Sequence, residues 1–276
     1  MIEFTEETSE QAVIAQFGEE IDPRLRMIMQ SVVKHLHGFV KEVEPTMDEW
    51  MQAIQILTRT GKISDDSRQE WILTSDTLGV SMLVEAINHR RPDKVTENTV
   101  LGPFHVSGAP ARALGDTICL DGKGTPCFVS GQVCDEGGTP IAGASLDVWQ
   151  TNDDGFYDVQ QPSEQPNMNM RGLFTTDAKG GYNFVTVKPL PYSIPTDGPV
   201  GDMLKGLGRH GMRPAHIHYI VQAPGYETLV THIFVDGDPY LESDAVFGVK
   251  NSLIVAFKDS GDSSSATFDI KLKKVG

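Results

Sequence analysis

Two histidines of this sequence stand at a spacing that suits metal binding. His216 and His218 lie two residues apart in the segment RPAHIHY, so on a β-strand both side chains would project from the same face. Imidazole nitrogens placed in this way can bind one metal ion. An isolated pair of this kind also fits two half-buried histidines that hydrogen-bond to neighbouring groups, because His is intermediate in its burial preference. The pair alone leaves both interpretations open.

Two tyrosines occupy unusual settings among turn residues. Tyr157 lies in TNDDGFYDVQ, and Tyr192 lies in KPLPYSIPTDGPVG. A single tyrosine beside a turn is usually an amphipathic side chain with a solvated hydroxyl group, and either residue alone would be explained in this way. The occurrence of both tyrosines together with the histidine pair makes a shared site a stronger hypothesis.

The first third of the chain has the apolar pattern of amphipathic helices. Between residues 8 and 91, apolar side chains recur with helical period. One helix is predicted to start at Asp22 as N-cap, with Pro23 at its first position. Capping-box pairs of Thr46 with Glu49 and of Ser67 with Glu70 mark two further starts. We predict four helices, the last of them running from Ser67 to Asn88.

Beyond Arg91-Pro92 the pattern changes to short strands between turn clusters. Such short, meandering strands usually form a sandwich. We therefore predict an α+β protein, with a helical linker or dimerisation domain over residues 1–97 and an antiparallel β-sandwich catalytic domain over residues 98–276. The predicted strands are Phe128 to Val133, Ser145 to Gln150, Tyr182 to Val187, His216 to Gln222, Thr228 to Val235, Ser252 to Phe257 and Thr267 to Leu272.

In order and spacing, the two tyrosines and two histidines resemble the iron ligands of the intradiol ring-cleavage dioxygenases. The resemblance covers roughly residues 70 to 258. Within that family, the chain is most similar to the hydroxyquinol-cleaving branch. It rests on the segments LGPFHVSGAP, SGQVCDEGGTPIAGASLDVWQTNDDGFYD, RGLFTTDAKGGYNF, GRHGMRPAHIHY and THIFVDGDPYLESDAVFGVK. The resemblance implies Fe(III)-dependent cleavage of hydroxyquinol (benzene-1,2,4-triol) by O2 to 3-hydroxy-cis,cis-muconate, the enol form of maleylacetate. Catechol or chlorocatechol is the alternative substrate.

The resemblance also implies which residues form the metal centre. One Fe(III) ion per chain would be held by Tyr157, Tyr192, His216 and His218, and the counterpart of Tyr192 leaves the metal during catalysis. Phenolate oxygen is a hard anionic donor, so two tyrosinates favour the ferric state. Arg213, three residues before His216, has a counterpart that faces the negative charge developing on the ring. An arginine at a strand end can also be a structural partner of a carboxylate.

A substrate pocket can be carried over from the same branch. Asp76 would offer an acceptor to a substrate hydroxyl group, although a solvated helix residue is an equally good interpretation of its position. His232 stands where catechol-cleaving members typically have Gln, and Leu101 stands where a larger aromatic residue is expected. The predicted pocket residues are Leu73, Asp76, Val100, Leu101, Gly102, Pro103, Phe104, Ile194, Pro195 and Val246.

Composition limits the possible partners and compartments. The formal net charge of -15 argues against nucleic-acid binding, which depends on clustered Lys and Arg. Three cysteines without a CxxC pair favour neither a disulfide framework nor a thiolate zinc site, so we expect a cytoplasmic protein. No apolar run approaches the ~20 residues of a membrane span. The family resemblance implies a homodimer formed through the amino-terminal helices, with phospholipid bound at the interface.

Two other classes of protein share part of this pattern. The segment from Gly131 to Phe184 resembles non-catalytic prealbumin-like sandwich modules, and one sandwich can host unrelated functions. Such modules have no reason to carry two tyrosines and a histidine pair in this order. A histidine-based zinc hydrolase would need three protein ligands and an open position, without tyrosinate.

Overall fold

The computed structural model describes residues 2–65, 68–90 and 94–275. The chain divides into two compact units, Met1–Thr58 and Arg59–Gly276, and helix α3 crosses the boundary between them. The helices of the described part are α1 Ser9–Ile14, α2 Pro23–Val43, α3 Met47–Ile63, α4 Glu70–Thr77, α5 Val80–Asn88 and α6 Pro199–Gly206. None of them is long and apolar enough to cross a lipid bilayer.

Two of the predicted helix starts in the first unit are confirmed by their capping bonds. The Asp22 carboxylate accepts a bond from the backbone N–H of Leu25 at 2.8 Å, and Pro23 is the first residue of α2. At the start of α3, the backbone N–H of Thr46 donates to Glu49 at 2.8 Å, and the N–H of Glu49 donates back to the Thr46 hydroxyl group at 3.3 Å. These bonds satisfy backbone donors that have no partner within the helix.

The prediction of a single helix from Ser67 to Asn88 is wrong. The chain forms two helices, α4 and α5, separated at Gly79, which adopts a left-handed conformation with φ of 74°. Glycine adopts this conformation without a steric cost, and it interrupts the helical path. Ser67, the predicted cap, lies outside the described residues. Glu70 has another role, because it accepts bonds from Arg68 and from the backbone N–H of Val200 at the start of α6.

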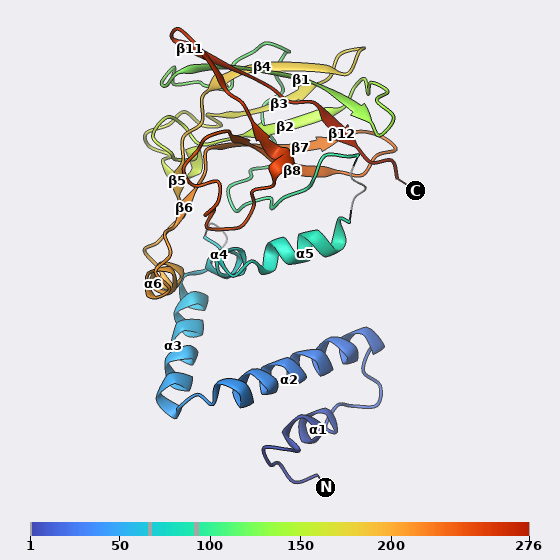
Figure 1. The fold of residues 1–276 in the computed structure, drawn as a ribbon, viewed down its shortest axis with the longest axis vertical. Helices are drawn as coiled ribbons and strands as arrows, with labels where there is room; N and C mark the ends of the chain where they lie inside the picture. Colours follow the sequence, from blue (N-terminus) through green and yellow to red (C-terminus); the bar gives the residue numbers. More distant parts are fainter. Residues whose placement is uncertain (1, 66–67, 91–93, 276) are drawn as a thin grey trace. The chain divides into compact units, whose positions relative to one another are not determined.

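The second unit contains a sandwich of two five-stranded sheets (Figure 1). One sheet has the order β10-β11-β1-β12, and β4 also pairs with β1; the other has the order β3-β2-β7-β8-β9. A separate two-stranded sheet joins β5 to β6. The strands are β1 Pro126–Asp135, β2 Ser145–Trp149, β3 Arg171–Thr175, β4 Gly181–Val187, β5 Tyr192–Ser193, β6 Met212–Arg213, β7 His216–Gln222, β8 Leu229–Val235, β9 Ile254–Val255, β10 Lys258–Ser260, β11 Ser263–Thr267 and β12 Ile270–Leu272.

The order of a helical region followed by a β-sandwich is confirmed, but the sheets are mixed rather than antiparallel throughout. β1 pairs in parallel with both β11 and β12, and β8 pairs in parallel with β9. The strand predicted from Ser252 to Phe257 is reduced to β9, because residues Asn251–Leu253 form a 3-10 turn. The strand predicted from Thr267 to Leu272 is two strands, β11 and β12.

The hydrophobic core lies between the two sheets and follows from strand alternation. On β7, Ile217, Tyr219 and Val221 are fully buried in the core cluster. Because successive side chains of a strand point to opposite faces, His216 and His218 project from the other face of the same sheet. The core therefore fixes the orientation of the histidine pair.

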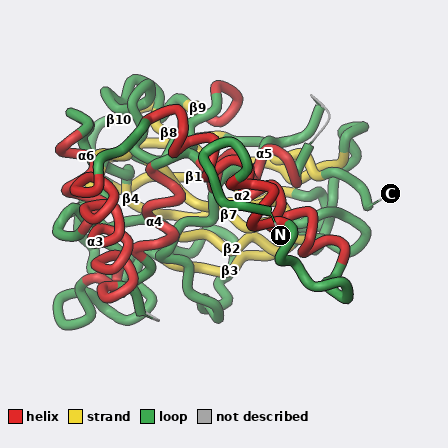
Figure 2. Tube along the Cα trace, turned by 90° about the horizontal axis from the view of Figure 1, so that it is seen from below, coloured by secondary structure: helices red, strands yellow, loops and turns green. Residues whose placement is uncertain are grey.

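Helices and loops cover the face of the sheet that carries the histidines. Figures 1 and 2 show α4, α5 and α6 on the β7–β8 side of the sandwich. A second apolar cluster joins Leu73 of α4, Val200 and Leu204 of α6, and Val100, Ile194, Ala245 and Val246 of the loops. The segment after residue 98 is tied to β8, where the backbone N–H of Thr99 donates to the Val230 carbonyl group at 2.9 Å. This cover encloses the space above the histidines.

Candidate metal centre

A row of ring side chains crosses three strands of the sheet. Trp149 on β2 pairs across from His218 on β7, and His218 pairs across from His232 on β8. The Trp149 and His218 rings are stacked, with centroids 4.6 Å apart and planes at 14°. His216 lies beside this row on β7, and its ring contacts those of both His218 and His232. All three histidines are at most 3% exposed.

The four predicted ligand side chains converge on one point. The Nε2 atoms of His216 and His218 lie 3.1 Å apart. The Tyr157 hydroxyl oxygen lies 2.8 Å from His218 Nε2 and 3.2 Å from the Tyr192 hydroxyl oxygen. Two nitrogen and two oxygen donors from four separate chain positions thus face one another in a buried site.

The imidazole groups are held in a state that suits metal binding. Burial and the nearby Arg213 charge lower the pKa of His216 to about 3. Burial also lowers the pKa values of His218 and His232 well below their usual value, and neighbouring histidines add to the effect. His216 Nδ1 lies 2.6 Å from the Pro214 carbonyl oxygen, so it carries the proton and leaves Nε2 unprotonated. A carbonyl partner on the distal nitrogen is typical of metal-binding histidine.

Tyr157 is placed by a tight loop and a buried ion pair. The Asn152 side chain accepts bonds from the backbone N–H groups of Asp154 and Phe156, which turns the chain just before Tyr157. The next residue, Asp158, accepts two bonds from Arg171 of β3, at 2.9 and 2.6 Å. Burial raises the pKa of Tyr157 well above its usual value, so a metal would have to displace a proton to bind it as tyrosinate.

Tyr192 and Arg213 are held together by the small two-stranded sheet. They are directly paired residues of β5 and β6. The Arg213 guanidinium group forms a buried pair with Asp244, with Nε 3.0 Å from Oδ1, and its Nη1 lies 3.3 Å from His216 Nε2. Although burial opposes the ionised form, Arg213 lowers the pKa of Asp244 below its usual value. Arg213 therefore pairs with a carboxylate, as its structural interpretation requires, and it also lies beside His216.

A closed cavity of about 10 Å³ lies against Tyr192 and Arg213. It is lined by nine of the predicted pocket residues, Leu73, Asp76, Val100, Gly102, Pro103, Phe104, Ile194, Pro195 and Val246. A wider cavity of about 180 Å³, which Arg68, Gln69, Glu70 and Gln160 also line, shares Leu73, Pro103, Phe104 and Pro195 with it. A cavity of roughly 150 Å³ holds one benzene molecule. An aromatic ring therefore fits the wider cavity, and the inner one must widen to admit it.

One predicted pocket residue, Leu101, differs from expectation, and for another, Asp76, the structure decides between two interpretations. Leu101 is 42% exposed and is not among the residues that line the cavity, so the structure does not support its inclusion. Asp76 is only 3% exposed, which excludes the interpretation as a solvated helix residue. Burial raises the pKa of the Asp76 carboxyl group, while the Ser81 hydroxyl group and the Arg213 charge act in the opposite direction.

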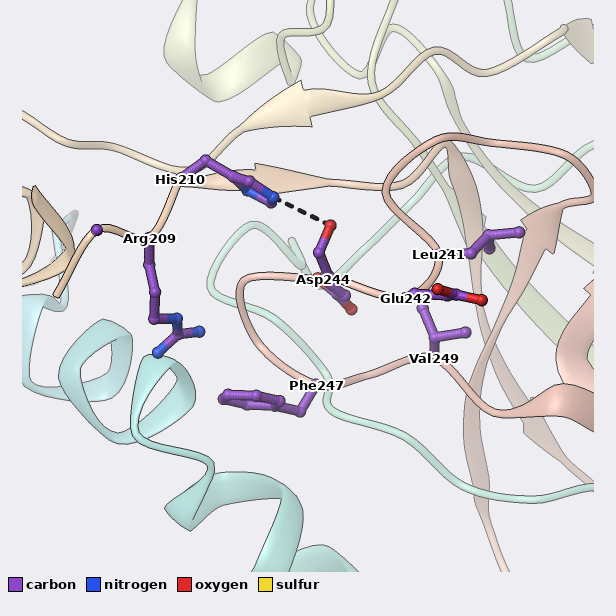
Figure 3. Close-up of a pocket in the computed structure, with 9 residues that line it drawn as sticks. Arg209, His210, Leu241, Glu242, Asp244, Phe247 and Val249 are labelled. Atoms are coloured by element: carbon purple, nitrogen blue, oxygen red, sulfur yellow. Dashed lines mark hydrogen bonds between the residues drawn. The ribbon is translucent and has the colours of Figure 1, made fainter.

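A third cavity lies away from the four converging side chains, none of which lines it. It has a volume of about 440 Å³ and lies between residues 208–210 and 241–249 (Figure 3). Arg209 and Phe247 both line this cavity, and the Arg209 guanidinium group lies 4.8 Å from the centre of the Phe247 ring. Its lining includes Asp244 and His210 but no tyrosine. Of the four converging side chains, Tyr192 lines the smaller cavity.

Sequence reasoning missed two residues that the structure brings to the site, and it gave no site role to a third, His232. Asp244 holds Arg213, Trp149 stacks on His218, and His232 completes a group of three histidines whose nitrogens lie within 4.8 Å of one another. His232 had a signal, since it departs from the family pattern. Asp244 lies 31 residues from Arg213, and no local spacing connects them.

Two histidines and two tyrosines that meet in a buried cluster on a β-sandwich offer a donor set for a metal ion, and comparison with known proteins identifies the class of protein. The family model described as "Dioxygenase" matches residues 101–274, and the model described as "Catechol dioxygenase N terminus" matches residues 22–96. The chain belongs to the intradiol ring-cleavage dioxygenases.

Individual relatives agree with this assignment. The chain is 57% identical to a hydroxyquinol 1,2-dioxygenase of Rhizobium sp. over 95% of its own length and 89% of the relative. It is 49% identical to a 6-chlorohydroxyquinol 1,2-dioxygenase of Cupriavidus pinatubonensis, with 92% of each chain covered. The crystal structure of a hydroxyquinol 1,2-dioxygenase from Pseudomonas putida superimposes with a TM-score of 0.93 at 47% identity, covering 98% of this chain and 99% of that one.

Proposed function

We propose that this enzyme cleaves hydroxyquinol between its two adjacent hydroxyl-bearing carbons, with Fe(III) held by Tyr157, Tyr192, His216 and His218. The observation that carries the proposal is the convergence of these four side chains, in which each donor atom lies within 3.2 Å of another donor atom of the set. The names of relatives that act on hydroxyquinol or its chloro derivative support this substrate class. Both atoms of O2 would enter the product as the carbon–carbon bond breaks.

The donor set fits a ferric ion. Two phenolate oxygens are hard anionic ligands that favour the ferric over the ferrous state, and two neutral imidazoles complete the set. The charges also fit, because two tyrosinates and one hydroxide balance the charge of Fe(III) in a buried site. When bound, the ion would withdraw electron density from the diol and so make the ring reactive toward O2.

The protein would position the ring and stabilise its charge. Phe104 stacks on Tyr157 with ring centroids 4.6 Å apart, which fixes one wall of the cavity beside the metal ligands. Apolar side chains of Leu73, Val100 and Val246 exclude water from the ring. The buried Arg213 guanidinium group, held by Asp244, would face the negative charge that develops on the substrate.

Oxygen consumption together with product identification tests the reaction itself. Intradiol cleavage of hydroxyquinol should consume one O2 per ring and yield maleylacetate or its enol form. A product opened beside the two hydroxyl-bearing carbons, rather than between them, would contradict the proposal. If catechol or chlorocatechol is cleaved faster than hydroxyquinol, the proposed intradiol cleavage stands and the proposed substrate is wrong.

The Asp76→Ala variant should narrow the preference for hydroxyquinol over catechol, chiefly by weakening hydroxyquinol. Asp76 is a buried acceptor in the cavity lining, and catechol leaves it without the partner that a third hydroxyl group provides. An unpaired buried acceptor costs about 1–3 kcal/mol. That corresponds to roughly 5- to 150-fold discrimination in kcat/KM.

Oxygen uptake with each substrate, corrected for autoxidation of the triol, measures this ratio. The exposed residue Asp202 offers a matched control, and Asp202→Ala should leave the ratio unchanged. An unchanged ratio in Asp76→Ala would show that another group recognises the third hydroxyl.

We also propose that residues 1–97 form a dimerisation domain and residues 98–276 the catalytic domain, as the meeting of the two family models between residues 96 and 101 supports. An apolar stripe on α2 is exposed within the first unit and suits a protein or lipid partner. It consists of Leu25, Met29, Val32, Leu36, Val40 and Val43, each between 37% and 58% exposed. A cytoplasmic location is consistent with the three free cysteines.

The purified enzyme should sediment with twice the mass of one chain, and organic extracts should contain phospholipid detectable by mass spectrometry. Leu36→Glu places a charge in the stripe and should shift the enzyme toward monomer. Lys34→Glu, a charge change at an exposed position of the same helix, is the control. A monomeric wild-type enzyme would refute the dimer.

A further inference from the structure

Arg209 joins three segments of the second unit that are distant in the sequence. It follows the end of α6, where its backbone N–H donates to the Leu204 carbonyl group at 2.8 Å. Its guanidinium group donates to the carbonyl oxygen of Thr77 at 2.6 Å and to that of Ala245 at 3.0 Å. Both acceptor residues are fully buried. One side chain thus holds the end of α4 beside the loop that contains Ala245.

The bond to Thr77 satisfies the end of a helix. Thr77 is the last residue of α4, and the last four carbonyl groups of a helix have no partner within it. A cation at this end also interacts favourably with the helix dipole. Arginine suits the position because its planar fork presents donors to two acceptors at once, whereas lysine has a compact ammonium group.

Phe247 completes the contact. The Arg209 guanidinium group lies 4.8 Å from the centre of the Phe247 ring, within the range of a cation–π interaction (Figure 3). A β-carbon placed on Gly79 would lie 3.5 Å from this ring, so the ring also lies against the turn between α4 and α5. Phe247 has a φ of 59°, a left-handed conformation that a bulky residue keeps only where its surroundings hold it. Its contacts with Arg209 and with the turn at Gly79 provide that support.

The two anchored segments form part of the inner cavity. Asp76 precedes Thr77, and Val246 follows Ala245, and both of these neighbours line the cavity. The Asp76 carboxyl group is the proposed acceptor for the third hydroxyl group of the substrate. Arg209 does not line this cavity, so it can affect a bound ring only through the segments that it holds.

We propose that Arg209 is a positioning residue for substrate specificity, which fixes Asp76 relative to Val246 by bridging the backbone segments that carry them. This inference rests on the proposed function. The bridge sets the separation of two walls of the cavity, so that the third hydroxyl group of hydroxyquinol meets the Asp76 carboxyl group at hydrogen-bonding distance.

Arg209→Met removes the fork and keeps an unbranched side chain. It should leave the iron content unchanged and lower the ratio of kcat/KM for hydroxyquinol to that for catechol, mainly through a higher KM for hydroxyquinol. The expected loss is at least about 5-fold, the lower end of the effect of losing the Asp76 acceptor. Arg209→Lys should keep an intermediate ratio, because its ammonium group can still donate to a carbonyl group. Lys205→Met, at an exposed position in the last turn of α6, controls for the loss of a positive charge.

A double variant tests whether Arg209 acts through Asp76. If it does, adding Arg209→Met to Asp76→Ala should change the ratio by less than about 2-fold. A wild-type ratio in the single variant, or the same loss in both backgrounds, would overturn the inference. Should Arg209→Met not fold, Phe247→Leu, at a half-exposed side chain, should lower the ratio by up to about 5-fold through loss of the cation–π contact. An unchanged ratio in that variant would also overturn the inference.

Hydrogen exchange separates this inference from the proposed function. A wild-type enzyme without a preference for hydroxyquinol would refute the proposed substrate. The bridge is measured independently of any substrate, because amide hydrogens of residues 73–79 and 244–248 should exchange about 10-fold faster in Arg209→Met than in the wild-type enzyme or in Lys205→Met. Equal exchange rates in the three proteins would overturn the bridge.

Discussion

The His216→Ala and His218→Ala variants are expected to lose their iron and their ring-cleaving activity. Each substitution removes one of four donors that converge within a buried site, and the remaining three leave a hard ion with too few ligands. Loss of a supporting residue alone typically costs 10- to 100-fold, so removal of a ligand should cost more than about 100-fold. Tyr157→Phe should behave similarly, because it removes an oxygen donor while preserving the ring that packs against Phe104.

Metal analysis after gel filtration and oxygen uptake with hydroxyquinol measure both effects. His210→Ala provides a matched control, since His210 is exposed and its hydrogen bonds in the described structure are to the Ser243 hydroxyl group and from the backbone N–H of Met212. Full iron content and activity in all three ligand variants would mean that the metal is bound elsewhere.

The Arg213→Leu variant is expected to keep its iron but to turn over about 100-fold more slowly. Arg213 is the buried cation beside the cavity, and one electrostatic contact to the transition state is typically worth 10²- to 10³-fold. The substitution also leaves the Asp244 carboxylate buried without its partner, which costs about 3–5 kcal/mol of stability. The slow turnover must therefore be separated from partial unfolding.

A double variant makes that separation. Adding Asp244→Asn to Arg213→Leu removes the unpaired charge and should restore much of the free energy of unfolding, measured with urea, without restoring kcat. Arg59→Leu, which breaks only an exposed ion pair, controls for loss of an arginine. Recovery of kcat in the double variant would make Arg213 a structural residue.

The parts of the site that follow local rules were predictable from the sequence. Alternation along β7 places His216 and His218 on one face, and the capping residues of α2 and α3 mark their starts. The break at Gly79 was less visible, because the apolar pattern continues from α4 into α5 and only the left-handed conformation of the glycine separates the helices.

Long-range partners were not predictable. The parallel pairing of β1 with β11 and β12 joins segments more than a hundred residues apart, and a hydrophobic pattern does not specify strand direction. Asp244 and His232 reach the site for the same reason, through strand and loop packing rather than through sequence proximity. The buried state of Asp76 depends on how loops close over α4, which the helical pattern leaves open.

Iron content measured together with the visible spectrum tests the central claim most directly. A ferric ion bound by tyrosinate gives a red-brown protein through charge transfer, and the four converging donors predict about one iron per chain. Tyr157→Phe should remove or shift this absorption as it removes a ligand. Stoichiometric zinc in a colourless wild-type protein would contradict the account.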